Sequence, residues 1–283
     1  MSGYAVALGM FDSVHIGHRA VITETVKNSQ KSVAITFDEL PTKDKKTLLT
    51  IEERKQKLLS AGVSEVWVLC FNEVKNLTPN EFLEYLKGRG EIEKICSGFN
   101  FKFGKNAEGD TKFLKSFAEK NNIQFIEVPK IEVNGETVST SHIKKLLAKG
   151  EIDRANSLLG CNFSFSAEVV RGDTRGRKLG FPTINQIYPE NKTELKFGVY
   201  HTRVCIGGKI YDGVTNFGIR PTFKNNFVSA ETHIIDYSGD LYGKTIELSF
   251  VEYIRDERKF NNIEELIKEV NDNILYVKKS TNK

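Results

Sequence analysis

The pattern of apolar and polar positions divides the chain into two halves of different character. In the first half, short apolar runs alternate with stretches whose apolar residues recur every three or four positions. Short apolar runs between helical stretches are typical of buried parallel strands, and this alternation predicts a Rossmann-like α/β domain. The strands are expected at residues 4–8, 32–37, 65–70, 95–97 and 124–128.

Helix-start signals separate these apolar runs. Thr50 with Glu53, and Thr78 with Glu81, have the spacing of a capping box, in which two side chains satisfy backbone N–H groups at a helix start. Pro79 stands at the first helical position after Thr78, where a missing N–H group is tolerated. Helices are therefore expected to begin after residues 50 and 78. Further helices are expected at residues 111–121, 141–149 and 152–159.

The second half, from Phe163 onward, alternates apolar and polar residues between turn signals at 207–208 and 238–239. Several short strands at this spacing predict a small antiparallel barrel. Apolar residues then recur with helical spacing from Ile263 to Ile274, which predicts a closing helix. We therefore expect two domains, residues 1–158 and 159–283. The barrel strands are expected at residues 163–170, 198–206, 209–215, 228–235 and 245–252.

Composition and charge fit a folded protein of two domains that binds small molecules. The chain has 283 residues, of which 39% are hydrophobic and 28% charged, and this is too apolar for a disordered chain. The net charge of +4 is spread along the sequence, whereas a nucleic-acid surface usually needs a concentrated basic stripe. We therefore expect no nucleic-acid partner, while local positive charge suits a phosphorylated small substrate.

The remaining features of the composition predict a cytoplasmic protein. The first residues lack the charged and apolar regions of a signal peptide, and no apolar run is long enough to span a membrane, so we expect no membrane partner. The four cysteines, at positions 70, 96, 161 and 205, form no C-x-x-C pair and are too widely spaced for a zinc knuckle. Buried free thiols in a reducing compartment are expected. The sequence assigns no oligomeric state.

The first candidate site is segment 9–18, GMFDSVHIGH, which follows the first strand and opens a helix. Ligands of open parallel sheets bind at this edge, and the free N–H groups and positive dipole end of a helix start suit phosphate. His15 and His18 can donate hydrogen bonds to the charge that develops when the α-phosphorus of ATP is attacked. The simpler alternative is two surface histidines, or half of a metal site. The H-x-G-H spacing directly after a strand favours catalysis.

This turn resembles the signature of the HIGH-type nucleotidyltransferase superfamily, which implies nucleotidyl transfer. Gly17 lets the backbone pass close to a nucleotide, because it has no side chain. The ATP-binding residues expected in the turn are Gly9, Phe11, Asp12 and Gly17.

Two further segments fit the same site. Residues 138–144, VSTSHIK, open a helix, so their hydroxyl and N–H groups can meet another part of a triphosphate. Plain helix capping by Ser139 or Ser141 is the simpler alternative. Residues 97–105, SGFNFKFGK, combine a strand, a glycine and alternating phenylalanines, which suits a wall for a flat ring. Phenylalanines packed in a core are the alternative there.

The three segments in this order resemble the FMN adenylyltransferase half of bacterial bifunctional riboflavin kinase/FAD synthetases. The resemblance implies that the histidine turn and segment 138–144 hold ATP, and that segment 97–105 lies at the flavin side. Met10, Ser13 and Lys144 stand where the family usually has Asn, Gly and Arg, and residues 37–41 differ from its usual F-x-P-H-P. The implied catalytic residues are His15 and His18, the further ATP-binding residues are Ser139, Thr140, Ser141 and Lys144, and the flavin-binding residues are Asn100 and Phe37.

The second candidate site is segment 171–185, RGDTRGRKLGFPTIN, which is dense in Gly, Arg and Lys. Its glycines, including Gly172 and Gly180, allow a backbone to fold closely around phosphates. Thr183 and Asn185 lie two residues apart, so in an extended stretch they face one side and offer hard oxygen ligands for the Mg²⁺ of Mg-ATP. A basic hairpin loop is the simpler alternative. Neither Lys105 nor Lys244 belongs to a P-loop: Lys105 has the wrong spacing and no Ser or Thr after it, and Lys244 lacks the leading glycine, since position 238 is Ser.

The whole second half resembles a riboflavin kinase domain, through the segments 176–185, 197–200, 214–223, 231–236, 240–244 and 254–260 in family order. The resemblance implies a six-stranded antiparallel barrel with a C-terminal helix. It also implies that the strand carboxylate of Glu231 is the catalytic base, although a surface glutamate on an edge strand is the alternative. The implied ATP-binding residues are Gly172, Lys178, Gly180, Pro182, Thr183 and Asn185, with Thr183 and Asn185 at the metal, and the implied flavin-binding residues are Asn216 and Arg255.

Together the two halves predict a bifunctional enzyme of FAD biosynthesis. The barrel is expected to phosphorylate riboflavin to FMN with Mg-ATP, and the α/β domain to adenylylate FMN to FAD with release of pyrophosphate. Small-molecule substrates are the only partners expected. The alternatives are a chain with one activity only, with the adenylyltransferase as the weaker half, a flavin-binding regulator, or a cytidylyltransferase-like enzyme acting on another phosphate.

Overall fold

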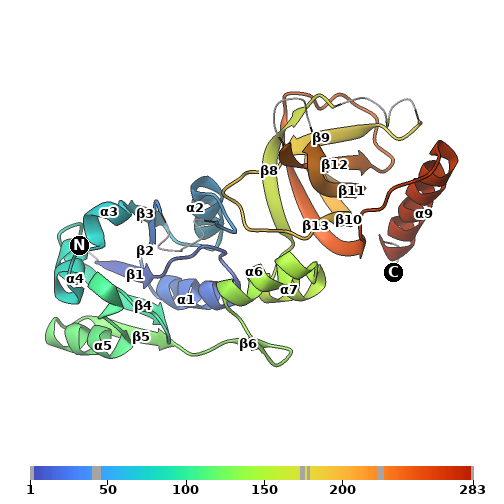
Figure 1. The fold of residues 1–283 in the computed structure, drawn as a ribbon. Coiled ribbons are helices and arrows are strands. Elements are labelled where there is room, and N and C mark those ends of the chain that lie inside the picture. The colour runs from blue at the N-terminus through green and yellow to red at the C-terminus, as the bar shows by residue number, and fades with distance from the viewer. Residues whose placement is uncertain (1–2, 40–45, 173–175, 177–178, 222–225, 282–283) are drawn as a thin grey trace. The chain divides into compact units, whose positions relative to one another are not determined.

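The computed structural model describes residues 3–39, 46–172, 176, 179–221 and 226–281 (Figure 1). The chain divides into two compact units, residues 1–142 and 143–283. The predicted domain boundary after residue 158 lies further along the chain and stays a prediction. No helix in the described part of the chain is both long and apolar enough to cross a membrane.

The first unit contains a five-stranded parallel sheet with the order β3-β2-β1-β4-β5, which confirms the expected α/β domain. The strand order changes direction between β1 and β4, and in such sheets ligands bind outside the carboxyl ends of the strands at this switch point. The strands are β1 (Tyr4–Leu8), β2 (Lys31–Phe37), β3 (Glu65–Leu69), β4 (Ile92–Gly98) and β5 (Gln124–Val128). The helices between them are α1 (Ile16–Val26), α2 (Ile51–Ser60), the single turn α3 (Phe71–Val74), α4 (Pro79–Lys87) and α5 (Thr111–Lys120).

Both capping boxes form as predicted, at Thr50 before α2 and at Thr78 before α4. The sheet separates two cores, because alternate residues of a strand face opposite sides. Val6 and Leu8 of β1 pack in the core with residues of α4 and α5, whereas Ala7 packs in the core with residues of α1 and α2. This packing fixes the start of α1 against the end of β1.

Several short elements complete the connection between the sheet and the barrel. They are the 3₁₀ turn η1 (Lys105–Ala107), the two-stranded hairpin β6 (Glu132–Val133) and β7 (Glu136–Thr137), and the helices α6 (Thr140–Lys149) and α7 (Ile152–Leu159). The sequence pattern predicted the two helices and missed the hairpin. Its strands are too short to show a period in the sequence.

The second unit contains a closed six-stranded antiparallel barrel with the order β10-β11-β12-β9-β8-β13, as predicted. Large buried rings fill it, among them Phe165, Tyr200, Phe217 and Phe250. The closing helix α9 (Ile263–Thr281) packs against the outside of the wall, where Val277 joins a small apolar cluster. The strands are β8 (Phe163–Val170), β9 (Thr183–Ile187), β10 (Gly198–Ile206), β11 (Lys209–Pro221), β12 (Asn226–Ile234) and β13 (Thr245–Arg255).

The four cysteines are free thiols, but burial, which was expected for them, holds only for Cys96. Cys205 is exposed, because the alternation along β10 turns its side chain away from the barrel interior. Cys70 and Cys161 are partly exposed.

Candidate active sites

The turn between β1 and α1 has an unusual backbone. Phe11 and Val14 have positive φ angles of 50° and 46°, a region that bulky side chains rarely adopt, although both are buried. Gly9 makes room for this turn, because a Cβ atom there would lie 2.9 Å from the ring of Phe11. Backbone conformations of this kind persist where the surrounding packing holds them, and they gather at functional sites.

His15 and His18 form a stacked pair at the start of α1. His15 caps the helix, since its Nδ1 accepts a hydrogen bond from the backbone N–H of His18 at 3.0 Å. The two rings are nearly parallel, with centroids 3.7 Å apart. Burial lowers the pKa of His15 to about 4. Burial, followed by the nearby His15 and Arg54, also holds the pKa of His18 well below its usual range.

These contacts fix the chemical form of His15. Both histidines are neutral at pH 7, because their pKa values are lowered. A neutral imidazole that accepts at Nδ1 carries its proton at Nε2. His15 is therefore a donor that brings no charge of its own, which suits the stabilisation of phosphate oxygens.

The second predicted ATP segment lies against this turn. The hydroxyl groups of Ser13 and Thr140 are 3.2 Å apart, although they are far apart in the sequence. Ser139 accepts a hydrogen bond from the backbone N–H of His142 at 3.3 Å, so the predicted capping by Ser139 is present as well. Ser141 and Lys144 follow on the first turns of α6. The structure thus brings the two segments together, while their contact with ATP stays a prediction.

An apolar pocket of about 280 Å³ lies beside the same turn. It is lined by Met10, by Phe37 at the end of β2, and by Phe101 and Phe103 from the predicted flavin-side segment. Asn100 is exposed in the turn after β4 and is not among the described residues that line this pocket. The pocket therefore offers ring faces and a thioether, which suit a flat aromatic ligand.

One row across the barrel wall carries four of the residues predicted for the second site. Directly opposite residues on antiparallel strands point to the same face, so a row is read from the strand register. The row runs through five strands and places four predicted residues side by side around the wall. In order it contains Arg255 of β13, Val199 of β10, Asn216 of β11, Glu231 of β12 and Asn185 of β9.

Strand β12 lies between two pockets. A pocket of about 670 Å³ is lined by Thr183, Asn185 and Thr232, together with Gly172 and Pro182. A pocket of about 330 Å³ is lined by Glu231, with Asn216 and Arg255 of the same row and with Leu266, Ile267 and Val270 of α9. Alternate residues of β12 thus serve different pockets. The sequence resemblance assigns nucleotide to the first and flavin to the second.

Gly172 sits tightly against Asn185. A Cβ atom at position 172 would lie 2.4 Å from the amide Nδ2 of Asn185, a distance that real Cβ atoms do not reach. Only glycine therefore fits there while the amide keeps its place. Gly180 has a positive φ of 88°, which also favours glycine. Lys178, predicted to bind ATP, lies outside the described residues.

Comparisons with known proteins match both halves. A family model described as FAD synthetase matches residues 1–142, and one described as riboflavin kinase matches residues 159–281. A Listeria monocytogenes protein named bifunctional riboflavin kinase/FMN adenylyltransferase is 31% identical and covers 93% of this chain and 87% of its own. The Bacillus subtilis protein of the same name is 32% identical and covers 94% and 88%. The chain belongs to this bifunctional family.

A solved structure shares the fold of both family domains. The crystal structure described as a macrolide-efflux protein from Streptococcus pneumoniae superimposes with a TM-score of 0.88 at 27% sequence identity. The superimposed region spans 98% of this chain and 95% of the Streptococcus pneumoniae chain. The similarity therefore extends through the adenylyltransferase domain and the riboflavin kinase domain alike.

Sequence reasoning missed a buried charge behind the adenylyltransferase turn. Arg54 of α2 is 1% exposed, and its Nη1 donates to the hydroxyl of Thr36 at 3.0 Å and to the carbonyl of Phe37 at 2.9 Å. Thr36 in turn donates to the carbonyl of Met10 at 2.8 Å. Burial lowers the pKa of Arg54, and the charge of Asp12, itself 3% exposed, opposes this. Arg54 therefore ties α2 to the turn through Thr36.

Three charged residues of the kinase domain were missed as well. Arg220 of β11 contacts Asn185 and Glu231. Glu269 of α9 pairs with Arg255 at 2.6 Å and with Arg258 at 2.5 Å, which holds the segment after β13 against the helix. Glu257 accepts a hydrogen bond from Asn216 at 3.2 Å. Arg220 and Glu257 lie in segments 214–223 and 254–260, which carry the family resemblance, but no sequence pattern singled out either side chain.

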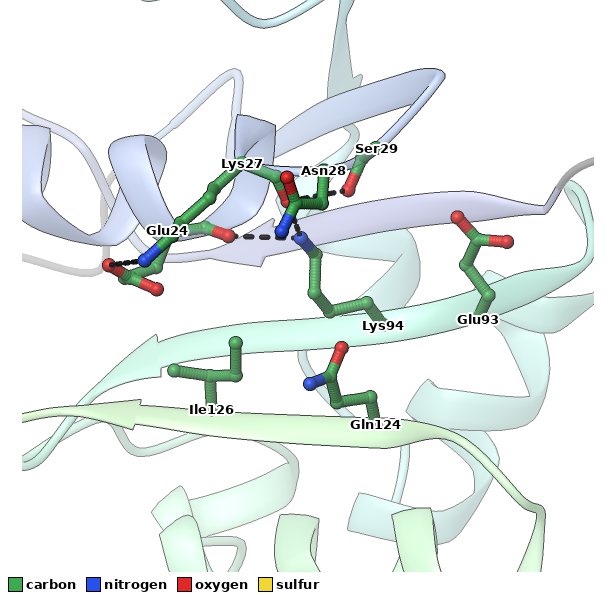
Figure 2. Close-up of a pocket in the computed structure, with 8 residues that line it drawn as sticks. All are labelled: Glu24, Lys27, Asn28, Ser29, Glu93, Lys94, Gln124 and Ile126. Carbon is green, nitrogen blue, oxygen red and sulfur yellow. Dashed lines mark hydrogen bonds and ion pairs between the residues drawn. The ribbon is translucent and has the colours of Figure 1, made fainter.

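A further pocket of about 430 Å³ lies near the amino ends of β4 and β5, away from the adenylyltransferase turn (Figure 2). Its central group is Lys94, which is buried and donates from Nζ to the carbonyls of Glu24 at 3.0 Å and Lys27 at 2.6 Å. These carbonyls end α1 and have no partner within the helix, and an ammonium also suits the negative dipole end. Lys94 thus anchors the far end of the helix that carries His18 at its start.

Proposed function

We propose that this chain carries out both reactions named for its relatives, phosphorylation of riboflavin to FMN and adenylylation of FMN to FAD. The observation that supports this most directly is the row Arg255, Asn216, Glu231 and Asn185, which joins the nucleotide and flavin pockets of the barrel. The stacked neutral histidines of the α/β domain support the second reaction. FMN, the product of the first reaction, is then a substrate of the second.

In the kinase domain, Glu231 accepts the proton of the ribityl 5′-hydroxyl, whose oxygen bonds to the γ-phosphorus of ATP while the bond to ADP breaks. Asn216 and Arg255 flank the flavin in the same pocket as Glu231. Thr183 and Asn185 supply neutral oxygen atoms, which fit a magnesium ion that arrives with ATP. When bound, magnesium offsets the charge of the phosphates.

In the adenylyltransferase domain, a phosphate oxygen of FMN bonds to the α-phosphorus of ATP and pyrophosphate leaves. No protein nucleophile is needed, because positioning and charge stabilisation carry the step. His15 donates from Nε2, and His18 stands beside it at the helix start, where free backbone N–H groups suit the phosphates. The isoalloxazine ring occupies the pocket lined by Phe37, Phe101 and Phe103.

A single incubation tests the function. The protein is mixed with riboflavin, ATP and Mg²⁺, and the flavins are separated by chromatography. FMN and FAD are expected; FMN alone leaves a kinase only, and tight flavin binding without conversion indicates a regulator. Glu231→Gln should stop FMN formation and leave FMN-to-FAD conversion intact. His15→Ala combined with His18→Ala should do the reverse, and a normal kinase rate for Glu231→Gln would refute the assignment of the base.

We also propose that the reactions take place in the cytoplasm. ATP is the cosubstrate of both steps, and the four cysteines are free thiols, as is usual for proteins of a reducing compartment. Recovery of the native protein after cell fractionation, with the flavin-converting activity followed in each fraction, tests this.

A further inference from the structure

Arg220 contacts one lining residue from each of the two pockets of the kinase domain. Its side chain is 15% exposed, and its Nη1 donates to Oδ1 of Asn185 at 2.9 Å. The same Nη1 lies 3.6 Å from Oε1 of Glu231. Asn185 lines the nucleotide pocket, whereas Glu231 lines the flavin pocket. One guanidinium therefore stands at the junction across which the phosphoryl group must pass.

The contact with Arg220 sets the orientation of the Asn185 amide. A guanidinium only donates hydrogen bonds, so it selects the amide oxygen and not the amide nitrogen. On the other side, Nδ2 lies so close to Gly172 that only glycine fits there. The amide is thus fixed from two sides, with its oxygen turned towards Arg220 and Glu231. An oxygen can bind a hard cation, whereas the NH₂ group cannot.

The carboxylate of Glu231 needs a similar constraint. It belongs to a flexible side chain that is 40% exposed. An ion pair with a planar guanidinium limits its rotation. Asn185 and Glu231 are direct register partners on β9 and β12, so one arginine can hold both from a third strand.

We propose that Arg220 is a positioning residue of the kinase reaction, which holds Asn185 and Glu231 in place across the junction of the nucleotide and flavin pockets. The proposal rests on the roles proposed above for those two residues. Arg220 acts through them, and it adds no proton transfer of its own. Its loss should slow the reaction while leaving the flavin pocket able to bind riboflavin.

The first test compares Arg220→Met and Arg220→Lys with Arg203→Met. Arg203 is a matched control, since it also lies on a barrel strand beside a carboxylate, that of Asp212. The kcat for FMN formation should fall about a hundredfold in Arg220→Met, the scale expected for a misplacement of roughly 1 Å. Riboflavin affinity, followed by flavin fluorescence, and the melting temperature should stay unchanged. Arg203→Met should retain normal kcat.

Arg220→Lys keeps the charge without the planar fork, so its kcat should remain at least about tenfold low. This variant also decides the case in which Arg220→Met folds poorly. A normal kcat for a folded Arg220→Lys overturns the proposal, and so does a loss of riboflavin affinity that accounts for the whole defect.

A second measurement does not depend on turnover. ADP binding with and without Mg²⁺ is measured by calorimetry in a His15→Ala and His18→Ala background, which weakens the other nucleotide site. Arg220→Met should reduce the gain in affinity given by Mg²⁺ about tenfold or more, as for partners that orient metal ligands. An unchanged gain would overturn the orientation of the Asn185 amide by Arg220.

A double-mutant cycle separates this proposal from the proposed function. In a Glu231→Asp background, which keeps a shortened carboxylate and hence a residual rate, Arg220→Met should lower kcat much less than in the native chain, because residues that act as a unit are not additive. Equal effects in both backgrounds would mean that Arg220 acts on its own. If Glu231→Gln is inactive while Arg220→Met is normal, only the role of Arg220 fails. If Glu231→Gln itself is normal, the proposed base fails first.

Discussion

Gly172→Ala should impair the kinase reaction by moving a single amide. The new Cβ atom would lie 2.4 Å from Nδ2 of Asn185, whereas ordinary contact begins at 3.4 Å, so the amide must shift by about 1 Å. A displacement of that size costs roughly a hundredfold in rate, or about 2.7 kcal/mol of transition-state stabilisation. We expect kcat/KM for FMN formation to fall by that factor.

The assay is chromatographic separation of FMN formed from riboflavin and ATP, with FMN-to-FAD conversion by the same sample as an internal standard. Gly88→Ala is the control, because Gly88 has an ordinary φ of −64° and a Cβ atom there meets its nearest atom at 3.4 Å. It should leave both reactions unchanged. A folded Gly172→Ala protein with normal kinase kcat/KM would refute the reasoning, since Asn185 would then not need its observed place.

Three further predictions concern stability and flavin binding. The pKa of His15 falls from 6.5 in the unfolded chain to about 4 in the folded protein, so its neutral form stabilises the fold above pH 6.5. About 3 kcal/mol of unfolding free energy should therefore be lost as the pH falls from 6.5 to 4. His15→Asn should lack this loss when denaturant unfolding is followed by the fluorescence of Trp67. Lys94→Met should lower the unfolding free energy by about 1–3 kcal/mol by the same assay, whereas Lys27→Met, at a side chain 63% exposed, should change it by less than about 0.5 kcal/mol. Glu269→Gln removes the carboxylate that pairs with Arg255 and Arg258 at the rim of the flavin pocket. The KM of the kinase for riboflavin should rise about tenfold while kcat stays unchanged. An unchanged KM would contradict this prediction.

Local patterns predicted most of the fold. The strand–turn–helix unit around residues 4–26 and both capping boxes depend on neighbouring residues, so they are visible in the sequence. Strand β9 was recognised only as an extended stretch, because TINQI has no clear alternation and becomes a strand through its partners β8 and β12. The ladder with β12 likewise carries β11 six residues past its predicted end at 215, to Pro221.

The candidate sites were predicted where a motif is continuous in the sequence, and missed where partners come from distant strands. Arg54 lies three residues after Ile51 and four before Leu58, so it shares the buried face of α2. A charge is unexpected there, and only the folded structure shows that Thr36 and Phe37 offer it acceptors. Arg220 and Glu269 are ordinary surface charges in the sequence. Only the barrel register and the packing of α9 bring them to the row of site residues.

Because alternate residues of β12 line two different pockets, this strand should tolerate substitutions better than insertions or deletions. A single inserted or deleted residue near its centre would turn Glu231 from the flavin side to the nucleotide side and would carry Thr232 the opposite way. The strand can therefore vary by substitution, whereas changes of length should abolish the kinase reaction outright. The glycine turn at 207–208, where β10 meets β11, should accept inserted residues with little effect.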